Sequence, residues 1–330
     1  MYVITGGAGF IGSNIAAALE AEGMGPLVIC DRLRDGDKWR NIAKRNLYDI
    51  VDPAKLFDFL DHYQDTVDAV IHMGAISATT ERDADLIVDT NFRLSRDLWR
   101  WCEKHKKPYI YASSAATYGD GSHGFQDLTT QEALAALRPL NAYGWSKVLF
   151  DRWVMDRLGH GVGGKGPRQW AGLRFFNVYG PNEYHKGRMS SVVSQIQPIA
   201  AAGETCRLFK SHNPNYADGG QLRDFIYVED CADVVLWLLK NPSVSGIFNL
   251  GTGKARSFAD LAKAVYAAVD KPFKVEFIPT PEDIRDKYQY FTEADMTRLR
   301  SAGYPGQFTP LEEGVARYVR NYLSDDDPYR

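Results

Sequence analysis

The chain has 330 residues, of which 45% are hydrophobic and 25% charged, and its formal net charge is -3 at pH 7. A chain of this length holds one large domain or two moderate ones, with enough apolar side chains to bury a core. Its charge balance provides no basic surface for nucleic acid and no polybasic membrane patch, and no apolar run is long enough to span a bilayer. The expected partners are therefore small molecules or other protein chains.

The cysteines indicate a cytoplasmic protein. The four of them are scattered along the chain without a C-x-x-C pair, which favours buried, reduced thiols over a disulfide framework. Residues 1–5 read as a strand rather than as a signal peptide. The histidines lack the mutual spacing of a zinc site, so we expect no metal.

The N-terminal stretch predicts a dinucleotide-binding turn. An apolar run, Met1 to Thr5, ends at a glycine, two more glycines follow at three-residue spacing, and an apolar helical pattern then runs to Leu19. Missing side chains let the backbone approach a pyrophosphate, and the helix N-terminus offers N–H groups and a positive dipole end. The residues expected to touch the cofactor here are Gly6, Gly9, Phe10, Ile11 and Gly12.

A second predicted strand, Pro26 to Cys30, delivers Asp31 about twenty residues after the turn, where an acid would meet the adenosine ribose. An acid at this place usually favours NAD. Cations follow it closely, and they could hold the 2′-phosphate of NADP: Arg32, Arg34, Lys38 and Arg40. We therefore favour NADP, with NAD possible; the alternative is a solvated loop whose charges balance Asp35 and Asp37.

Helical and strand patterns continue to alternate, which predicts an α/β fold with a Rossmann-type, doubly wound parallel sheet and a smaller C-terminal α/β substrate domain. We expect residues 1–175 to form the NADP-binding domain, residues 225–250 to return to it, and most of 176–330 to bind substrate. Predicted helices cover 55–63 and 84–105, and predicted strands 69–72 and 108–112. The turn after the first of these strands lies where open α/β sheets bind ligands: Met73, Gly74, Ala75, Ile76 and Ser77.

Two stretches carry candidate acid–base chemistry. Tyr143 and Lys147 are four residues apart, so they share one face of a helix, and a lysine beside a phenol favours the phenolate and lowers its pKa. That pair suits proton exchange with an alcohol, although the same spacing is common on surface helices. The hydroxyl-rich loop 113–119, which follows a strand, either binds a substrate oxygen or is an ordinary loop.

Together these motifs resemble the extended short-chain dehydrogenase/reductase family, in which they occur in the same order. The resemblance implies that Ser114, Tyr143 and Lys147 form the catalytic trio. Tyrosine would be the acid or base and serine would orient the hydroxyl. Tyrosine and lysine would also contact the cofactor, the lysine at the nicotinamide ribose. It further implies that Asn91 lies near the cofactor pocket.

Later stretches resemble a narrower branch of that family. Residues 174–181 match an R-x-x-N-x-Y-G-P signature with Asn177 facing the substrate and Val178 near the cofactor, and a His-Lys-Gly element follows at 185–187. This branch implies an epimerase of an ADP-linked heptose for lipopolysaccharide core synthesis, working as a homopentamer. Hydride would leave C6 for a bound NADP and return to the opposite face. Lys186, which would also contact the cofactor, would be a second proton-transfer group and should be partly desolvated.

The substrate contacts implied by this resemblance lie mainly in the second half of the chain. Arg223 is a candidate clamp on the substrate pyrophosphate, unless it pairs with Asp224 or Glu229. Some positions depart from the branch pattern: Pro53, Arg188, Gln195 and the stretch 213–221. The full set of expected substrate-binding residues is Asn177, Arg188, Gln195, Phe209, Lys210, Ser211, His212, Arg223 and Tyr288.

The last third supplies further helices, predicted over 230–239, 258–269, 294–302 and 311–323, and strands over 247–250 and 275–278. Residues 324–330 are expected to fray. Two alternatives remain open: another nucleotide-sugar enzyme of the same family, such as a UDP-hexose 4-epimerase or a dehydratase, and a protein that only binds or senses NADP. An acidic pair typical of the dehydratases is replaced by Ala115 and Ala116, and the sensor would be expected to lack Tyr143 and Lys147.

Overall fold

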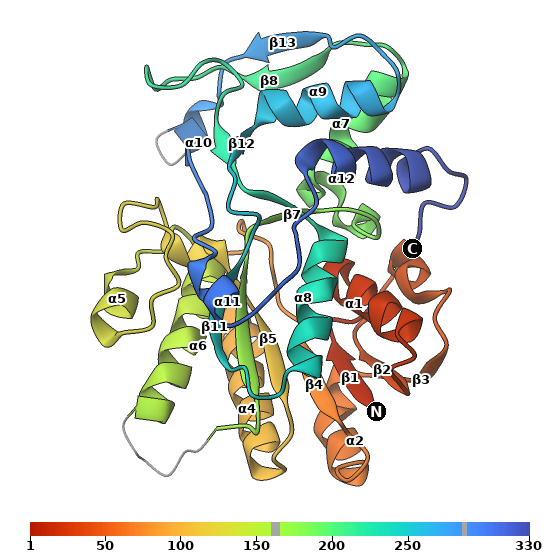
Figure 1. Cartoon of the computed structure of the whole chain (residues 1–330), viewed down its shortest axis with the longest axis vertical. Coiled ribbons are helices and arrows are strands. Elements are labelled where there is room, and N and C mark those ends of the chain that lie inside the picture. Colours follow the sequence, from red (N-terminus) through yellow and green to blue (C-terminus); the bar gives the residue numbers. More distant parts are fainter. Residues whose placement is uncertain (160–165, 286–288) are drawn as a thin grey trace.

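A seven-stranded parallel sheet forms the centre of the computed structural model, which describes residues 1–159, 166–285 and 289–330 (Figure 1). The strand order is β11-β6-β5-β4-β1-β2-β3. This doubly wound order confirms the predicted fold class. The strands are β1 Tyr2–Thr5, β2 Leu27–Cys30, β3 Leu47–Val51, β4 Ala69–His72, β5 Tyr109–Ser114, β6 Trp170–Phe175 and β11 Gly246–Leu250.

Helices cover both faces of this sheet. Successive residues of a strand point to opposite faces, so Ile4 of β1 joins one apolar cluster and Val3 the other. The first cluster includes residues of α1 (Phe10–Ala21) and α8 (Val228–Lys240), which pack against each other. The second includes residues of three further helices, α2 Leu56–His62, α4 Leu94–Lys104 and α6 Ala142–Gly159. Residues 228–250 thus lie with the N-terminal sheet.

A smaller lobe has its own apolar cluster and lies at the upper end of Figure 1. Its strands β8 and β13 pair in parallel, and its helices α7, α9 and α12 pack together. Their bounds are α7 Val192–Ala201, β8 Cys206–Phe209, α9 Phe258–Ala268, β13 Val275–Ile278 and α12 Leu311–Tyr318.

Shorter elements complete the fold. Two small sheets pair β7 with β10 and β9 with β12. The short strands and α-helices are α3 Ala84–Ile87, α5 Gln131–Ala136, β7 Asn177–Tyr179, β9 Leu222–Arg223, β10 Phe225–Tyr227, β12 Arg256–Ser257, α10 Glu282–Arg285 and α11 Thr297–Ser301. The remaining turns of helix are η1 Asp37–Ile42, η2 Pro53–Lys55, η3 Val88–Arg93, η4 Ala115–Tyr118, η5 Tyr184–Met189 and η6 Val319–Leu323.

Some predicted elements differ from the structure, and one strand was not predicted. The long helix expected over 84–105 is interrupted by the π-helical segment η3, and Asn91 lies in it. The helix expected from residue 294 begins only at Thr297, because the Ala294 N–H donates to Asp224 and the Thr297 N–H to Asp295. Strand β3 was not predicted; it forms the edge of the sheet, and its middle residues are exposed.

The prediction that residues 324–330 fray is wrong. Tyr329 is only 7% exposed, the Arg330 N–H donates to Asn182 at 2.9 Å, and the Arg330 guanidinium donates to Asn14 of α1 at 3.1 Å. The end of the chain, marked C in Figure 1, accordingly lies beside α1. The sequence carries no apolar periodicity there, since the partners of this tail come from distant segments.

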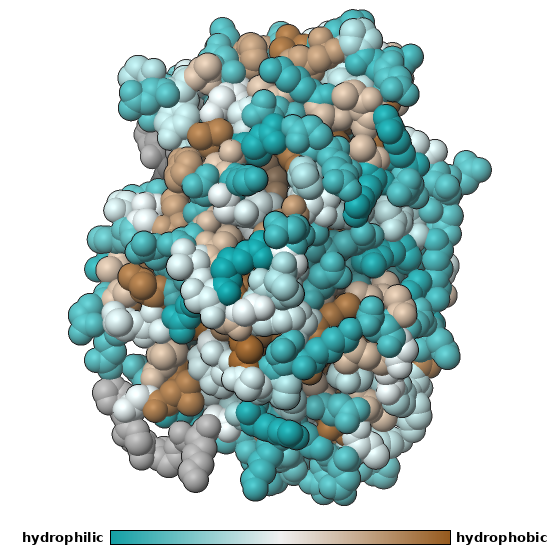
Figure 2. All heavy atoms as spheres, in the orientation of Figure 1, coloured by the Kyte–Doolittle hydropathy of each residue, from teal (hydrophilic) through white to brown (hydrophobic). Residues whose placement is uncertain are grey.

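The cysteines, possible metal ligands, helix hydrophobicity and surface can also be compared with the sequence analysis. All four cysteines are buried and free. Among the described residues, no group of histidine, cysteine or acidic side chains could hold a metal ion, and none of the helices has the length and apolar character to cross a membrane. Figure 2 shows a face on which hydrophilic residues dominate and hydrophobic ones form separate small groups.

Candidate active site

Close backbone contact between two turns builds the predicted cofactor cradle. Gly6, at the end of β1, has a φ of +64°, and a Cβ there would lie 2.6 Å from Gly74 Cα in the turn after β4. A Cβ on Gly12 would lie 2.3 Å from the Gly6 carbonyl oxygen. Helix α1 begins at Phe10 without a side-chain cap. The glycines therefore keep open a backbone surface with helix N–H groups, and these residues fit a dinucleotide pyrophosphate.

Asp31 is held in place at the end of β2. Its carboxylate accepts the Ala8 N–H at 3.0 Å and the Arg32 N–H at 2.7 Å, and forms an ion pair of 2.5 Å with Lys38. The carboxylate thus lies next to the glycine turn, as the ribose role requires.

The four cations near Asp31 do not share one role. Lys38 pairs with Asp31, and the Arg40 guanidinium lies over the Tyr329 ring, 4.5 Å from its centroid. Arg32 and Arg34 are exposed. Of the cations predicted to hold a 2′-phosphate, these two keep their side chains in solvent.

A buried hydrogen-bonded chain links the turn after β4 to helix α6. Asn91 accepts the Ile76 N–H at 2.8 Å and donates to the Ile76 carbonyl and to Ser146 Oγ, each at 3.0 Å. Ser146 in turn donates to the Tyr143 carbonyl at 2.7 Å. Asn91 therefore holds the turn after β4 and the start of α6 together. Met73, Gly74, Ala75 and Ile76 are partly buried in this turn, and Ser77 is exposed.

The hydrogen-bonded chain continues through His72, behind the turn after β4. Ser95 Oγ donates to the Asn91 carbonyl at 2.6 Å, so its oxygen accepts the Nε2–H of His72 at 2.8 Å. His72 Nδ1 then accepts from the Thr5 hydroxyl at 2.5 Å. Burial lowers the pKa of His72 to about 3, so its ring is neutral. Sequence reasoning did not assign this histidine a role.

Ser114, Tyr143 and Lys147 come together as predicted. Ser114 ends β5, and its side chain is hydrogen-bonded to the hydroxyl of Tyr143, the second residue of α6. The Lys147 amine lies 6.0 Å from the centroid of the Tyr143 ring, and this lysine is 3% exposed. A phenol, a hydroxyl and a buried amine thus share one site, which is suited to proton exchange with an alcohol.

The predicted direction of the Tyr143 pKa is wrong in this structure. Burial raises the pKa of the phenol, and the hydrogen bond from Ser114 opposes that rise only in part. A neighbouring cation favours the phenolate, whereas desolvation of the ring, which depends on the folded structure, favours the neutral phenol. Tyr143 is therefore a neutral phenol at neutral pH.

Asp151, one helical turn after Lys147, is a site residue that the sequence analysis missed. Burial lowers the pKa of Lys147 to about 8, and the Asp151 carboxylate opposes that effect. Asp151 also accepts from Ser113 at 2.9 Å and forms a fully buried ion pair of 3.0 Å with Arg174 of β6. An acid four residues after the predicted catalytic lysine on the same helix is a signal that the sequence contains.

Gly144 allows α6 to approach the hydroxyl-rich loop 113–119, which we call the serine loop. A Cβ there would lie 2.6 Å from the Ala116 carbonyl oxygen, whereas a Cβ on Gly159, at the end of the same helix, would meet nothing within 4 Å. We expect Gly144→Ala to lower the free energy of unfolding by about 1–3 kcal/mol. It should also lower turnover by up to about 10²-fold, because the Ser114–Tyr143 geometry shifts. Denaturant unfolding and steady-state kinetics would measure both effects.

Gly159→Ala is the matched control for that change and should leave both quantities close to wild type. Equal values for the two variants would contradict the close approach of α6 to the serine loop.

Lys186 lies on η5, where its amine is 5.3 Å from the centroid of the Phe10 ring at the glycine turn. Burial lowers its pKa, and the nearby Glu183 carboxylate partly opposes that effect. The expected partial desolvation is therefore present. The structure brings Lys186 to the glycine turn.

The substrate side is tied to the serine loop by Gln289, which the sequence analysis did not single out as a site residue. Gln289 Nε2 donates to the Gly119 carbonyl at 2.8 Å, and the backbone carbonyl of Gln289 accepts from the Arg223 guanidinium. Arg223 is buried and also donates to the Leu222 carbonyl. Asn177, at the start of β7, is exposed, and Val178 next to it is partly buried. Tyr288 lies outside the described residues.

The other predicted substrate contacts are more peripheral. The His212 N–H donates to the Tyr290 hydroxyl at 2.8 Å, so the stretch that follows β8 meets the segment carrying Gln289. Gln195 donates to the Ser190 carbonyl at 2.7 Å and therefore supports the loop that carries Arg188, which is exposed. The remaining predicted residues lie at the end of β8 and the start of the next loop: Phe209, Lys210 and Ser211.

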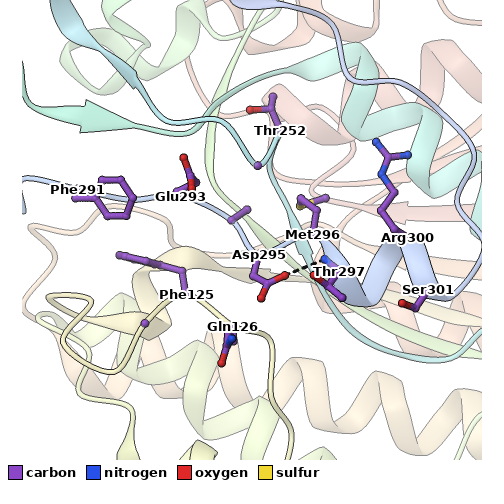
Figure 3. A pocket seen from close by; sticks show the side chains of 13 residues that line it. Phe125, Gln126, Thr252, Phe291, Glu293, Asp295, Met296, Thr297, Arg300 and Ser301 are labelled. Atoms are coloured by element: carbon purple, nitrogen blue, oxygen red, sulfur yellow. Dashed lines mark hydrogen bonds between the residues drawn. The ribbon is translucent and has the colours of Figure 1, made fainter.

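A hollow of about 990 Å³ is lined in part by Phe125 and Phe291, whose ring centroids are 5.9 Å apart (Figure 3). Acidic and basic side chains from the segment around α11 line it, but none of the predicted catalytic residues does. Arg300 in its wall is already engaged, since it donates to the Tyr304 carbonyl at 3.1 Å. We assign no ligand to this hollow.

Fold and site together define the class of the protein. The chain belongs to the NAD dependent epimerase/dehydratase family, whose model matches residues 2–251. It is 51% identical, over the whole of both chains, to the ADP-L-glycero-D-manno-heptose-6-epimerase of Nitratidesulfovibrio vulgaris strain Hildenborough.

Solved structures agree with that grouping. The crystal structure of the Helicobacter pylori ADP-L-glycero-D-manno-heptose-6-epimerase is similar, with a TM-score of 0.79, 28% identity, and coverage of 98% of this chain and 96% of that one. The Thermus thermophilus UDP-glucose 4-epimerase, solved as a complex with NAD, has a TM-score of 0.74, 25% identity, and coverage of 96% and 97%.

Proposed function

We propose that the protein is an ADP-L-glycero-D-manno-heptose 6-epimerase, which converts ADP-D-glycero-D-manno-heptose to its L-glycero epimer for lipopolysaccharide core synthesis. The observation that carries the proposal is the 51% identity over the whole of both chains with an enzyme of that name. The position of Lys186 supports this proposal. Its partly desolvated amine lies at the glycine turn, in addition to the Ser114–Tyr143–Lys147 group.

The cofactor would be a nicotinamide dinucleotide, and we propose NADP. When bound, it supplies a hydride acceptor that stays on the protein, which an inversion without net redox change requires. Gly6, Gly12 and the start of α1 would hold its pyrophosphate. Because Lys38 neutralises Asp31, the exposed Arg32 and Arg34 beside it would favour a 2′-phosphate.

The residues of this chain would handle the protons. Tyr143 would exchange a proton with the C6 hydroxyl in one orientation of the substrate, while Ser114 orients that hydroxyl and Lys147 binds the ribose of the cofactor. Lys186 would exchange the proton in the other orientation. Arg223 would bind the substrate pyrophosphate, and Asn177 would face the sugar. Residues 1–175 with the returning 225–250 would bind cofactor, and most of 176–330 substrate.

The proposal is tested by incubating the purified protein with ADP-D-glycero-D-manno-heptose without added reductant. NMR would give the C6 configuration of the product, and mass spectrometry the bound nucleotide. Formation of the L-glycero epimer with NADP retained is the expected result. Turnover of UDP-hexoses and not of the ADP-heptose would assign the chain to another activity of the family.

Lys147 gives a pH dependence that belongs to this proposal. With a pKa of about 8, the amine is cationic below that pH and becomes neutral above it. If the cation is needed for activity, kcat should fall as the pH rises above about 8. Lys147→Arg should be slower than wild type but lack this alkaline fall, since arginine keeps its charge. Parallel kcat profiles of the two proteins would contradict a role for the Lys147 charge.

We infer further that the protein is a cytoplasmic homo-oligomer, with the pentamer favoured by the resemblance. Light scattering of the purified protein measures this state directly, and a monomer would contradict it.

A further inference from the structure

The C-terminal segment 325–330, which we call the C-terminal clasp, makes contacts that the proposed reaction does not use. Its side chains and backbone reach two segments that are far apart in sequence. One is η1 with the residues that follow it, and the other is η5 with the residues that precede it. These segments carry Lys38 and Lys186, respectively.

The contacts with the first segment are an ion pair, a hydrogen bond and a ring contact. Asp327 pairs with Lys44 at 2.9 Å, and Lys44 also donates to the Tyr329 carbonyl. The Tyr329 ring lies beneath the Arg40 guanidinium, 4.5 Å from it. A buried aromatic ring under a cation is a stabilising contact.

The contacts with the second segment surround the residues just before Lys186. The Tyr184 hydroxyl donates to the Pro328 carbonyl at 2.7 Å, and its ring meets the Tyr329 ring edge-on with centroids 5.2 Å apart. The Arg330 N–H donates to Asn182 Oδ1 at 2.9 Å. Asn182 is buried with a φ of +72°, so its side chain contacts help to fix an uncommon backbone conformation.

The two segments also meet each other directly. Asn182 Nδ2 donates to the Asn41 carbonyl at 3.3 Å, and the Asn41 side chain lies 3.1 Å from His185 Nδ1 while donating to the Ala8 carbonyl in the glycine turn at 2.9 Å. The clasp therefore contacts both η1 and η5 where these segments meet, next to the glycine turn.

We propose that the C-terminal clasp is a positioning element: Tyr329 and Arg330 hold η1 and η5 against each other, and this fixes the Lys186 amine over Phe10 at the glycine turn. Neither residue touches the reacting atoms. The inference rests on the proposed role of Lys186, and it adds residues at the end of the chain to those that determine the rate.

The test compares Tyr329→Ala with Tyr329→Phe, which keeps the ring, and with Asp326→Asn, an exposed control in the same segment. Hydrogen–deuterium exchange should become faster in residues 37–45 and 182–190 of Tyr329→Ala and stay unchanged in β1 and β4. Its kcat should fall by about 10-fold or more with KM within about threefold, because a displaced catalytic group costs rate rather than binding. Tyr329→Phe and Asp326→Asn should match wild type in every readout.

Unchanged exchange in both segments, or faster exchange with kcat unaltered, would overturn the proposal. If Tyr329→Ala does not fold, Lys44→Met is the second variant, since it removes the ion pair with Asp327 and the hydrogen bond to the Tyr329 carbonyl and keeps an unbranched chain. The exchange measurement needs no substrate. It therefore tests the clasp even if the ADP-heptose is not converted, in which case the proposed function fails separately.

Discussion

Tyr143→Phe is expected to lower kcat for C6 inversion by about 10²–10⁴-fold, the usual contribution of a general acid or base. The change removes the phenol proton and its hydrogen bond with Ser114 and leaves the ring in place beside Lys147. Cofactor binding should persist, because the glycine turn is untouched. Initial rates by NMR, with the bound nucleotide measured by mass spectrometry, would show both results.

Tyr48→Phe is the matched control, since Tyr48 is 53% exposed on edge strand β3. It should turn over like wild type. A Tyr143→Phe protein with turnover close to that of the control would remove the phenol from the reaction.

Lys186→Met is expected to produce a loss of similar size, about 10²–10⁴-fold in kcat. Methionine keeps the unbranched stem and its packing against Phe10 but cannot exchange a proton. Because burial already lowers the pKa of the amine, its removal takes away a group suited to proton transfer nearer neutral pH. Rates should be measured from both epimers, since Tyr143 and Lys186 would serve opposite orientations of the substrate.

An exposed lysine provides the control for that change. Lys240 on α8 pairs with Glu22 at 2.5 Å at the surface, and Lys240→Met should leave the rates unchanged. Near-wild-type turnover by both Tyr143→Phe and Lys186→Met would rule out the scheme with two proton-transfer groups.

Much of the fold followed from local sequence signals. A strand, a glycine turn and an amphipathic helix leave few alternatives at the N-terminus, and the alternation of apolar strands and helices predicted the parallel sheet. Strand β3 and the C-terminal clasp were missed because neither produces a local sequence pattern. Edge strand β3 has little apolar periodicity, and the clasp depends on side chains of residues 14, 40, 44, 182 and 184, which a local pattern does not reveal.

The sequence predicted which residues form the candidate site better than it predicted their pKa shifts. Motif order placed Ser114, Tyr143 and Lys147, and the structure brings them together. The raised pKa of Tyr143 was not predicted, because it depends on how far the ring is buried. Gln289 was likewise missed as a site residue, since its link to Gly119 joins positions 170 residues apart.

The measurement that tests the central claim most directly is turnover of ADP-D-glycero-D-manno-heptose deuterated at C6. Hydride removal and return within one site predict that the L-glycero product keeps the deuterium at C6, with none released to water. Inversion accompanied by loss of the label to solvent would indicate proton abstraction at carbon instead, and it would contradict epimerisation through transient oxidation at C6.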